Sequence, residues 1–510
     1  MPNFRSVDRN LKFIAVDFDA QILPGTFEHA VSVLVDQELD LTPFIETYRN
    51  DATGMPAHHP SVLLEVILFG YSRGLISPRA IAAACRQHVL FIALSADSQP
   101  DFSTLAGFVS RRAEAIQSLF TQVLVICNRE GLIGHEMFAI DGVKLPSNAA
   151  KSRSGLREDF AREAQKVEHA VEKMLAEHHR QDAAKVEPEQ EQRKREVDKI
   201  ERLRTHAKQI RTWLEKNPRD RLGASGKPVL SNRTDNESAK MSTDKGVVQG
   251  YCGVAAVDEK HQIIVAAQAH GTGSEQALLP GIVEDLKPVL TEESVIVADA
   301  GYHSEANLAH LEAEKVEAYI ADRGYRERDE RYAGQDKHKA KDDALWDKSP
   351  KDRKPKQFPP SAFRFADDLS YCICPAGKRL YRSGNNCNRS GLRSIGFKGT
   401  QTACSNCKLR AQCLRKPDKT PVRQVALFLG KHESAPERPI ERMRRKIDTE
   451  QGRRMITRRF ATVEPVFANL RHNKGLDRFT LRSRKKVEGQ WRLYCLVHNI
   501  EKLMRARQAR

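Results

Sequence analysis

Five apolar segments with the character of β-strands recur between residues 137 and 320, and their order limits the fold more than any other feature of the chain. Three of these segments come first, and the last two alternate with stretches of helical periodicity. We therefore expect an α/β domain whose last element is a helical region beginning near residue 434. The predicted strands are residues 137–145, 250–257, 262–270, 294–299 and 316–320, and the predicted helices are residues 274–288 and 304–315.

Two insertions interrupt this order. Residues 156–216 are strongly charged and carry a narrow apolar stripe at three-four spacing, broken at Pro188. This pattern predicts a helical hairpin, although an extended solvated helix fits it nearly as well. The second insertion, residues 326–433, joins a charged linker to a cysteine-rich segment. Without the insertions, three antiparallel strands precede alternating helices and strands, which is the element order of an RNase H-like fold.

The first 130 residues are predicted to be all-helical. Segments 59–73, 77–94 and 101–129 have helical periodicity, and Ser77-Pro78 marks a helix start because proline is favoured in a first turn. Three helices with tight turns fit a helix-turn-helix DNA reader and a plain helical bundle equally well.

Three acidic residues fall at matching points of the predicted fold. Asp141 lies on the first strand, Asp299 ends the fourth strand, and Glu464 lies in the terminal helical region. Each has an ordinary explanation by itself, namely a turn, a helix cap and a surface glutamate. Pro465 would put Glu464 at the start of a helix or at a kink. In open α/β sheets, however, functional sites gather at the carboxyl ends of strands.

The chemistry that needs three carboxylates is phosphodiester attack. It requires an activated water or 3′-hydroxyl and a stabilised leaving oxygen, and two Mg²⁺ ions about 3.5–4 Å apart supply both. Mg²⁺ prefers hard oxygen ligands and keeps several of its waters, so a few carboxylates are enough to hold it. We therefore expect the three acids to bind two divalent metal ions.

The formal net charge of +17 suits a polyanionic partner such as DNA, RNA or an anionic membrane. Because no apolar run is long enough to span a bilayer and the N-terminus has no apolar signal core, we expect a cytoplasmic protein without a membrane partner. A solvated basic face explains any single basic residue about as well as DNA binding does. The candidates for contacts with DNA phosphates are Lys144, His303, Arg458, Arg459, Arg471 and Lys474.

Six of the ten cysteines lie within residues 372–413. In a reducing compartment such a cluster is more often a metal site than a set of disulfides. Cys372 and Cys387 are alternative ligands, and unmetallated thiols are the alternative to any metal. The predicted site is a structural, tetrahedral Zn²⁺ site formed by Cys374, Cys404, Cys407 and Cys413, of which the middle two have the spacing of a zinc knuckle.

Several segments resemble bacterial insertion-sequence transposases of the DDE class. Residues 58–110 resemble the helical N-terminal domain that this family shares with InsH-type transposases. The other similar segments are IDGVKLPSNAAK (140–151), NRTDNESAKM (232–241), KGVVQGYCGVAAVD (245–258), VADAGYHSEAN (297–307) and the region from ATVEPVF to HNIEKL (461–503). The resemblance covers nearly the whole chain and implies an RNase H-like catalytic domain. It also implies the same four zinc-binding cysteines and a catalytic triad of Asp141, Asp299 and Glu464.

The chain departs from this family around the last acid. Relatives often carry Tyr, Arg, Glu and Lys at fixed spacing, and that spacing puts Thr457, Phe460 and Arg471 at the Tyr, Arg and Lys positions. The nearest arginines are Arg458 and Arg459, one or two residues before Phe460. Because a helix can use neighbouring positions for the same contact, the family pattern does not assign the residues that contact phosphate in this chain.

The resemblance implies a transposase that cuts DNA at the terminal inverted repeats of its insertion sequence and joins the freed ends to target DNA, with two Mg²⁺ or Mn²⁺ ions per active site. A homodimer or a larger synaptic oligomer is expected because two DNA ends must be held together. Such a protein would act at the bacterial nucleoid. The alternatives are an RNase H-like nuclease without joining activity and an inactive, domesticated DNA-binding protein.

Four parts are predicted along the chain. A helical N-terminal DNA-binding domain occupies 1–130, and the first part of the catalytic core occupies 131–325, with the helical hairpin inserted into it. The linker and cysteine-rich insertion follow at 326–433, and the C-terminal helical part of the core occupies 434–510.

Overall fold

The computed structural model describes residues 16–49, 56–184, 190–223, 226–243, 246–334, 357–389, 392–431 and 437–509. The chain forms two compact units, which are described separately. The first unit comprises Met1–Tyr325 together with Met443–Arg510, and the second comprises Arg326–Arg442. Pro188, where the predicted hairpin breaks, and linker residues 335–356 lie outside the described residues.

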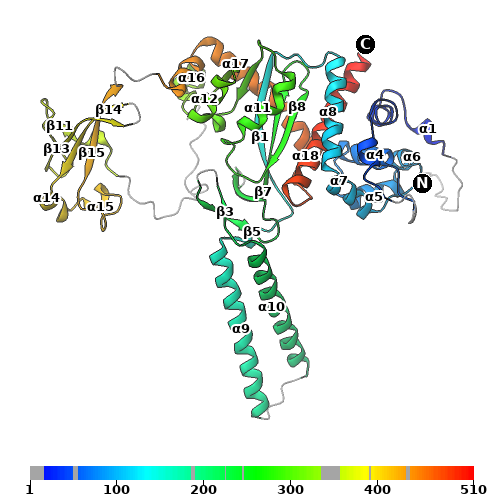
Figure 1. Ribbon diagram of the computed structural model, residues 1–510, viewed down its shortest axis with the longest axis horizontal. Coiled ribbons are helices and arrows are strands. Elements are labelled where there is room, and N and C mark those ends of the chain that lie inside the picture. The colour runs from blue at the N-terminus through cyan, green and yellow to red at the C-terminus, as the bar shows by residue number, and fades with distance from the viewer. Residues whose placement is uncertain are drawn as a thin grey trace, which may run out of the picture. The chain divides into compact units, whose positions relative to one another are not determined.

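A six-stranded mixed sheet forms the centre of the first unit (Figure 1). Its strands are ordered β10-β9-β1-β7-β6, and β8 also pairs with β7. β1 is antiparallel to β7 and parallel to β9, which is in turn parallel to β10. Five of these strands correspond to the predicted ones, and β6 was not predicted. The bounds are β1 Met137–Pro146, β6 Ala239–Thr243, β7 Gly246–Asp258, β8 Ile264–His270, β9 Val295–Ala298 and β10 Glu317–Ile320.

The helices that follow the strands mostly agree with the predicted ones, with one correction. The helix predicted from residue 274 begins only at Leu279, because the preceding residues form a turn in which the Leu278 N–H donates a hydrogen bond to the Glu275 carbonyl. Among the described residues, no helix combines the length and apolarity that crossing a bilayer requires. The bounds are α11 Leu279–Leu286, α12 Glu305–Ala313, α16 Pro439–Ile447, α17 Glu450–Ala468 and α18 Arg484–Gln508.

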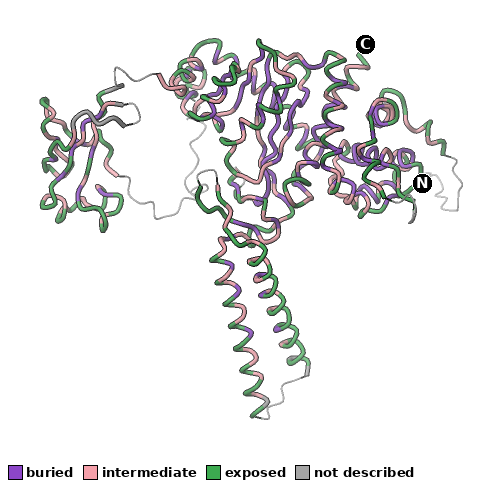
Figure 2. Tube along the Cα trace, in the orientation of Figure 1, coloured by how far each residue is buried: buried purple, intermediate pink, exposed green. Residues whose placement is uncertain are grey.

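The charged insertion forms two long helices, α9 (Arg157–Ala183) and α10 (Gln190–Lys216), which pack side by side as a hairpin (Figure 1). Phe160, Ala164 and Ile210 form a small core near its base. Figure 2 shows that most of the remaining hairpin surface is exposed. Short strands join the base to the rest of the unit: β2 Ser154–Gly155, β3 Arg221–Leu222, β4 Pro228–Val229 and β5 Ser231–Asn232.

The N-terminal helices pack against α18 and belong to the first compact unit. Two of the predicted helices are each divided in two. His88 adopts an extended backbone and its ring accepts a hydrogen bond from the Leu90 N–H, and the chain breaks again at Arg112. The bounds are α1 Phe18–Gln21, α2 Phe27–Val33, α3 Thr42–Ile45, α4 Pro60–Ser72, α5 Pro78–Gln87, α6 Val89–Leu94, α7 Phe102–Arg111 and α8 Ala113–Arg129.

The second unit contains an antiparallel sheet that the sequence analysis did not predict. Its five strands are ordered β11-β12-β13-β14-β15. Apolar side chains, including Phe363, Leu380 and Phe397, form its core. The bounds are β11 Arg364–Phe365, β12 Tyr371–Ile373, β13 Arg379–Arg389, β14 Leu392–Gly399, β15 Gln424–Lys431, α14 Gln401–Ser405 and α15 Arg410–Cys413.

Glu65 is buried among the apolar residues of α4, and this burial gives the N-terminal helices a pH-dependent stability. Burial, with a smaller contribution from the charge of Asp36, raises the pKa of Glu65 from 4.5 to about 8. Between these two values the unfolded chain ionises first, so the stability contribution of Glu65 falls as pH rises, by up to about 1.4 kcal/mol per pH unit.

Glu65→Gln removes this titration. The melting temperature of the variant should therefore rise relative to wild type as pH increases from 5 to 8.5, as followed by circular dichroism. The exposed Glu46→Gln is the control and should keep the wild-type pH profile. A constant difference between Glu65→Gln and wild type at all pH values would contradict the prediction.

Candidate active site

Two of the predicted acids lie side by side at one edge of the sheet. β1 and β9 are parallel neighbours, and Ile140 is paired with Ala298 in their register. The next residue of each strand is an aspartate, Asp141 on β1 and Asp299 directly after β9. Because parallel strands end on the same side, the two carboxylates lie next to each other at the carboxyl edge.

Arg459 of α17 holds this pair of carboxylates. Its guanidinium is buried, with Nη2 3.0 Å from Oδ2 of Asp141 and Nη1 3.9 Å from Oδ1 of Asp299. Its Nε also donates a hydrogen bond of 3.1 Å to the carbonyl oxygen of Ile140. The arginine is therefore fixed to the backbone of β1 and supplies the positive charge nearest to both acids.

The Asp141 carboxyl lies in a poorly solvated position. Burial raises its pKa from 3.8 to about 6, and the Arg459 charge and the Gly142 N–H oppose this rise. The negative charges of Asp299 and Glu275 add to it. The Asp141 carboxyl therefore lies among other acids at the edge of the sheet, and the Arg459 charge offsets only part of the rise in its pKa.

Glu275, which the sequence analysis did not single out, lies beside these acids. It belongs to the loop between β8 and α11, and its side chain is only 12 % exposed. Its Oε1 is 3.5 Å from Nζ of Lys144 and accepts a long hydrogen bond, 3.6 Å, from the thiol of Cys252. The signal that could have identified it is an acid in the Gly-rich stretch between a strand and a helix.

The third predicted acid, Glu464, lies on the exposed face of α17. The helix begins at Glu450, so Glu464 is neither at its start, as Pro465 suggested, nor at a break, since Pro465 lies inside the helix. Glu464 is five positions after Arg459, a rotation of roughly 140° around the helix axis. The structure thus brings Asp141 and Asp299 together but turns Glu464 toward solvent.

Among the residues that the structure describes, no group of three or more His, Cys, Asp or Glu side chains is arranged to hold a metal ion. At the sheet edge, the Arg459 guanidinium lies against the two aspartates. Beside them the Tyr302 ring is fully buried, and its hydroxyl has no hydrogen-bond partner in the described structure.

Three parts of the chain match known protein families. Residues 16–111 match a transposase domain (DUF772), and residues 226–359 and 373–504 match two families that are both described as transposase DDE domain. The chain belongs to the DDE transposases. Asp299 and Glu464 fall within the matched ranges, whereas Asp141 lies outside them. No curated protein matches the chain.

The basic residues predicted to bind DNA have different environments in this transposase. Arg458 pairs with Glu259, with 2.6 Å between Nε and Oε1, and Lys474 is buried against Glu501. Arg471 is exposed in the π-helical turn that follows α17. The other predicted contacts are the partly exposed Lys144, the half-buried His303 and the buried Arg459.

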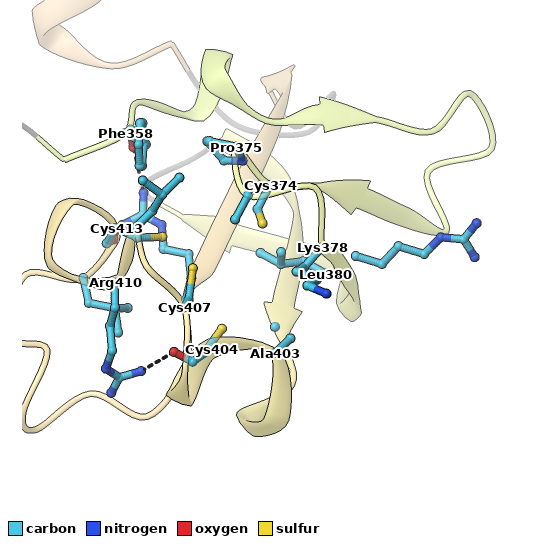
Figure 3. A pocket seen from close by; sticks show the side chains of 16 residues that line it. Phe358, Cys374, Pro375, Lys378, Leu380, Ala403, Cys404, Cys407, Arg410 and Cys413 are labelled. Atoms are coloured by element: carbon cyan, nitrogen blue, oxygen red, sulfur yellow. Dashed lines mark hydrogen bonds between the residues drawn. The ribbon is translucent and has the colours of Figure 1, made fainter.

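The cysteines of the second unit line a common pocket (Figure 3). The sulfur atoms of Cys374, Cys404, Cys407 and Cys413 face the same space in Figure 3, without forming the arrangement of a metal-bound cluster. Burial raises the pKa of Cys413, Arg423 opposes the rise, and the other three cysteines add to it. The alternative ligand Cys372 is buried in the apolar core of the sheet, and the side chain of Cys387 lies outside the described structure.

Replacing Arg459 tests how far the sheet edge depends on its charge. Arg459→Met should destabilise the metal-free protein, because Asp141 and Asp299 would then lack their shared counter-charge. Breaking a buried ion pair costs roughly 3–5 kcal/mol, and the loss should be smaller here because Asp299 is 48 % exposed.

The measurement is chemical denaturation with and without Mg²⁺. Metal should restore more stability to Arg459→Met than to wild type, since a cation can replace the missing arginine. Arg454→Met, an exposed arginine on the same helix, is the matched control. Equal stability of the two variants would rule out the structural role given to Arg459.

Proposed function

We propose that this transposase cuts DNA at the terminal inverted repeats of its insertion sequence and transfers the freed 3′ ends to target DNA. The observation that carries the proposal is the pair of carboxylates, Asp141 and Asp299, at the carboxyl edge of two parallel strands. In this proposal the mixed sheet is an RNase H-like core, in keeping with its strand order and the matched DDE domains.

The residues at this edge suit a divalent cation. Carboxylate oxygens are hard ligands, and two carboxylates close together are costly without a counter-charge. We propose that Asp141, Asp299 and Glu464 hold two Mg²⁺ or Mn²⁺ ions. Glu464 lies on the exposed face of α17, where it is open to solvent and to an approaching substrate. The ions would make the attacking oxygen nucleophilic and stabilise the leaving oxygen.

The chain's own residues would bind and orient the DNA. The high positive charge favours phosphate binding, and Lys144 and the exposed Arg471 can reach solvent. Arg459 can hold the two aspartates in place through its contacts with both carboxylates. His303 follows the 3₁₀ turn after Asp299 and could approach the same phosphate. Arg458 and Lys474 would first have to leave Glu259 and Glu501.

Assembly and location follow from the same proposal. Two element ends must be held together before joining, so we propose a homodimer or a larger synaptic complex. We propose that it acts in the bacterial cytoplasm, at the nucleoid. A nuclease that cuts without joining, or an inactive DNA-binding descendant, would instead give only nicked products or none.

We also propose a structural Zn²⁺ site in the second unit. The four thiols of Cys374, Cys404, Cys407 and Cys413 line one pocket, and four cysteine sulfurs form the usual tetrahedral site for this ion. Such a site would be independent of catalysis, because thiolates suit Mg²⁺ poorly.

Asp299→Asn tests the catalytic proposal. Cleavage of DNA carrying the terminal repeats should fall by more than about a hundredfold, since several kcal/mol of transition-state stabilisation depend on the metal. DNA binding, followed by gel shift, should remain. The exposed Glu293→Gln, just before β9, is the control and should cut and join like wild type. Unimpaired cleavage by Asp299→Asn would exclude this site, and a wild type that nicks but never joins would exclude transposition.

The zinc proposal is tested by elemental analysis of the purified full chain. About one zinc per chain is expected. Cys407→Ser should lose the zinc, whereas Cys372→Ala should keep it because Cys372 belongs to the apolar core. Zinc-free wild-type protein would overturn the proposal, and loss of zinc only in Cys372→Ala would show that the ligand set is wrong.

A further inference from the structure

We propose that Glu275 is a further carboxylate of the metal centre and binds the cation directly, together with Asp141 and Asp299. This inference rests on the proposed metal-dependent function and adds a ligand that the sequence pattern did not reveal. It comes from the position of the Glu275 side chain, the partners available to it and the two glycines that face its carboxylate.

The Glu275 carboxylate lies between the two segments that carry the aspartates. A Cβ atom built on Gly142, next to Asp141, would be 3.1 Å from Cδ of Glu275. A Cβ atom built on Gly301, two residues after Asp299, would be 3.3 Å from its Oε2. Both segments therefore have a glycine where Glu275 approaches, and a side chain at either position would crowd the carboxylate.

The polar contacts of the Glu275 carboxylate in the described structure are long. Arg459 is engaged with the two aspartates, with its closer contact to Asp141. Among the residues that the structure describes, the cation near Glu275 is Lys144, at 3.5 Å, and the other polar contact is the long hydrogen bond from the Cys252 thiol. A carboxylate that is 12 % exposed normally has closer charged or hydrogen-bonding partners than these. A bound cation would supply the missing counter-charge.

Glu275 is also better placed than Glu464 to complete the site. Glu275 lies in a loop, outside any helix or strand. Rotation about its three side-chain torsions can turn the carboxylate toward the aspartates. Glu464 is held within a regular helix and faces away from the side of α17 that carries Arg459. Binding of one cation by all three carboxylates would require a rearrangement at the sheet edge in which Arg459 draws back from the aspartates.

Mn²⁺ binding to the full-length protein, followed by electron paramagnetic resonance without DNA, tests this assignment separately from activity. Glu275→Gln should weaken Mn²⁺ binding by at least roughly tenfold to a hundredfold, because losing only an outer partner of a metal ligand already costs that much. Glu284→Gln is the matched control, because this exposed glutamate on α11 pairs only with Lys287 among the described residues. It should bind Mn²⁺ like wild type.

A second pair of variants covers the other role open to Glu275, which is to position Lys144. Lys144→Met should leave Mn²⁺ binding unchanged or strengthen it if Glu275 is a ligand, because a competing cation is removed. Gly301→Ala should weaken binding by crowding the carboxylate, and it keeps the test valid if Glu275→Gln does not fold. Weaker binding in Lys144→Met, matching Glu275→Gln, would overturn the proposal in favour of a positioning role.

The outcomes also separate this inference from the proposed function. If Asp299→Asn loses Mn²⁺ binding while Glu275→Gln and Gly301→Ala keep it, Glu275 is not a ligand and the proposed metal site stands. If Asp299→Asn also binds Mn²⁺ like wild type, the cation is not at this edge and both proposals fail.

Discussion

The parallel pairing of β1 with β9 is the constraint on which the site depends. It puts Asp141 and Asp299 at the same level of the same sheet edge, where their charges repel each other. The fold tolerates this repulsion because α17 crosses the strands and inserts one buried guanidinium between sheet and solvent. Arg459 also donates a hydrogen bond to the Ile140 carbonyl. The same side chain therefore fixes α17 against β1 and balances the charge of the aspartates.

The last helix, α18, holds the remaining elements of the first unit around this edge. Trp491 packs so closely on β7 that a Cβ atom at Gly253 would be 3.1 Å from its ring, and its Nε1 donates to the Val254 carbonyl. Asn499 bonds both backbone groups of Ile264, beside the register shift in the β7–β8 pairing. On its other side, Tyr494 stacks on Tyr71 of α4. The N-terminal helices and the sheet therefore share one core.

The sequence predicted well what depends on local periodicity and strand order. The order of the strands and the meeting of Asp141 with Asp299 follow from apolar runs that end in an acid. The side of a helix that turns inward was not predictable in the same way. Arg458 and Arg459 are neighbours in an arginine-rich stretch, yet one pairs with Glu259 near the surface and the other is buried against the acids. Glu275 has no periodic context, so only tertiary packing reveals its position.

The hairpin insertion has a consequence for how the chain folds. About 100 residues separate β1 from its partner β7, and closing a long flexible loop slows folding through the entropy of bringing its ends together. Here the first turn of α9 is joined to the chain just after α10 by the hydrogen bond from the Arg157 N–H to Asp220, 2.9 Å long. Once the two helices have formed, the first and last residues of the insertion lie close together. The effective loop between the two strands is then far shorter than the sequence separation, so the first strand can find its partner nearly as if the insertion were absent.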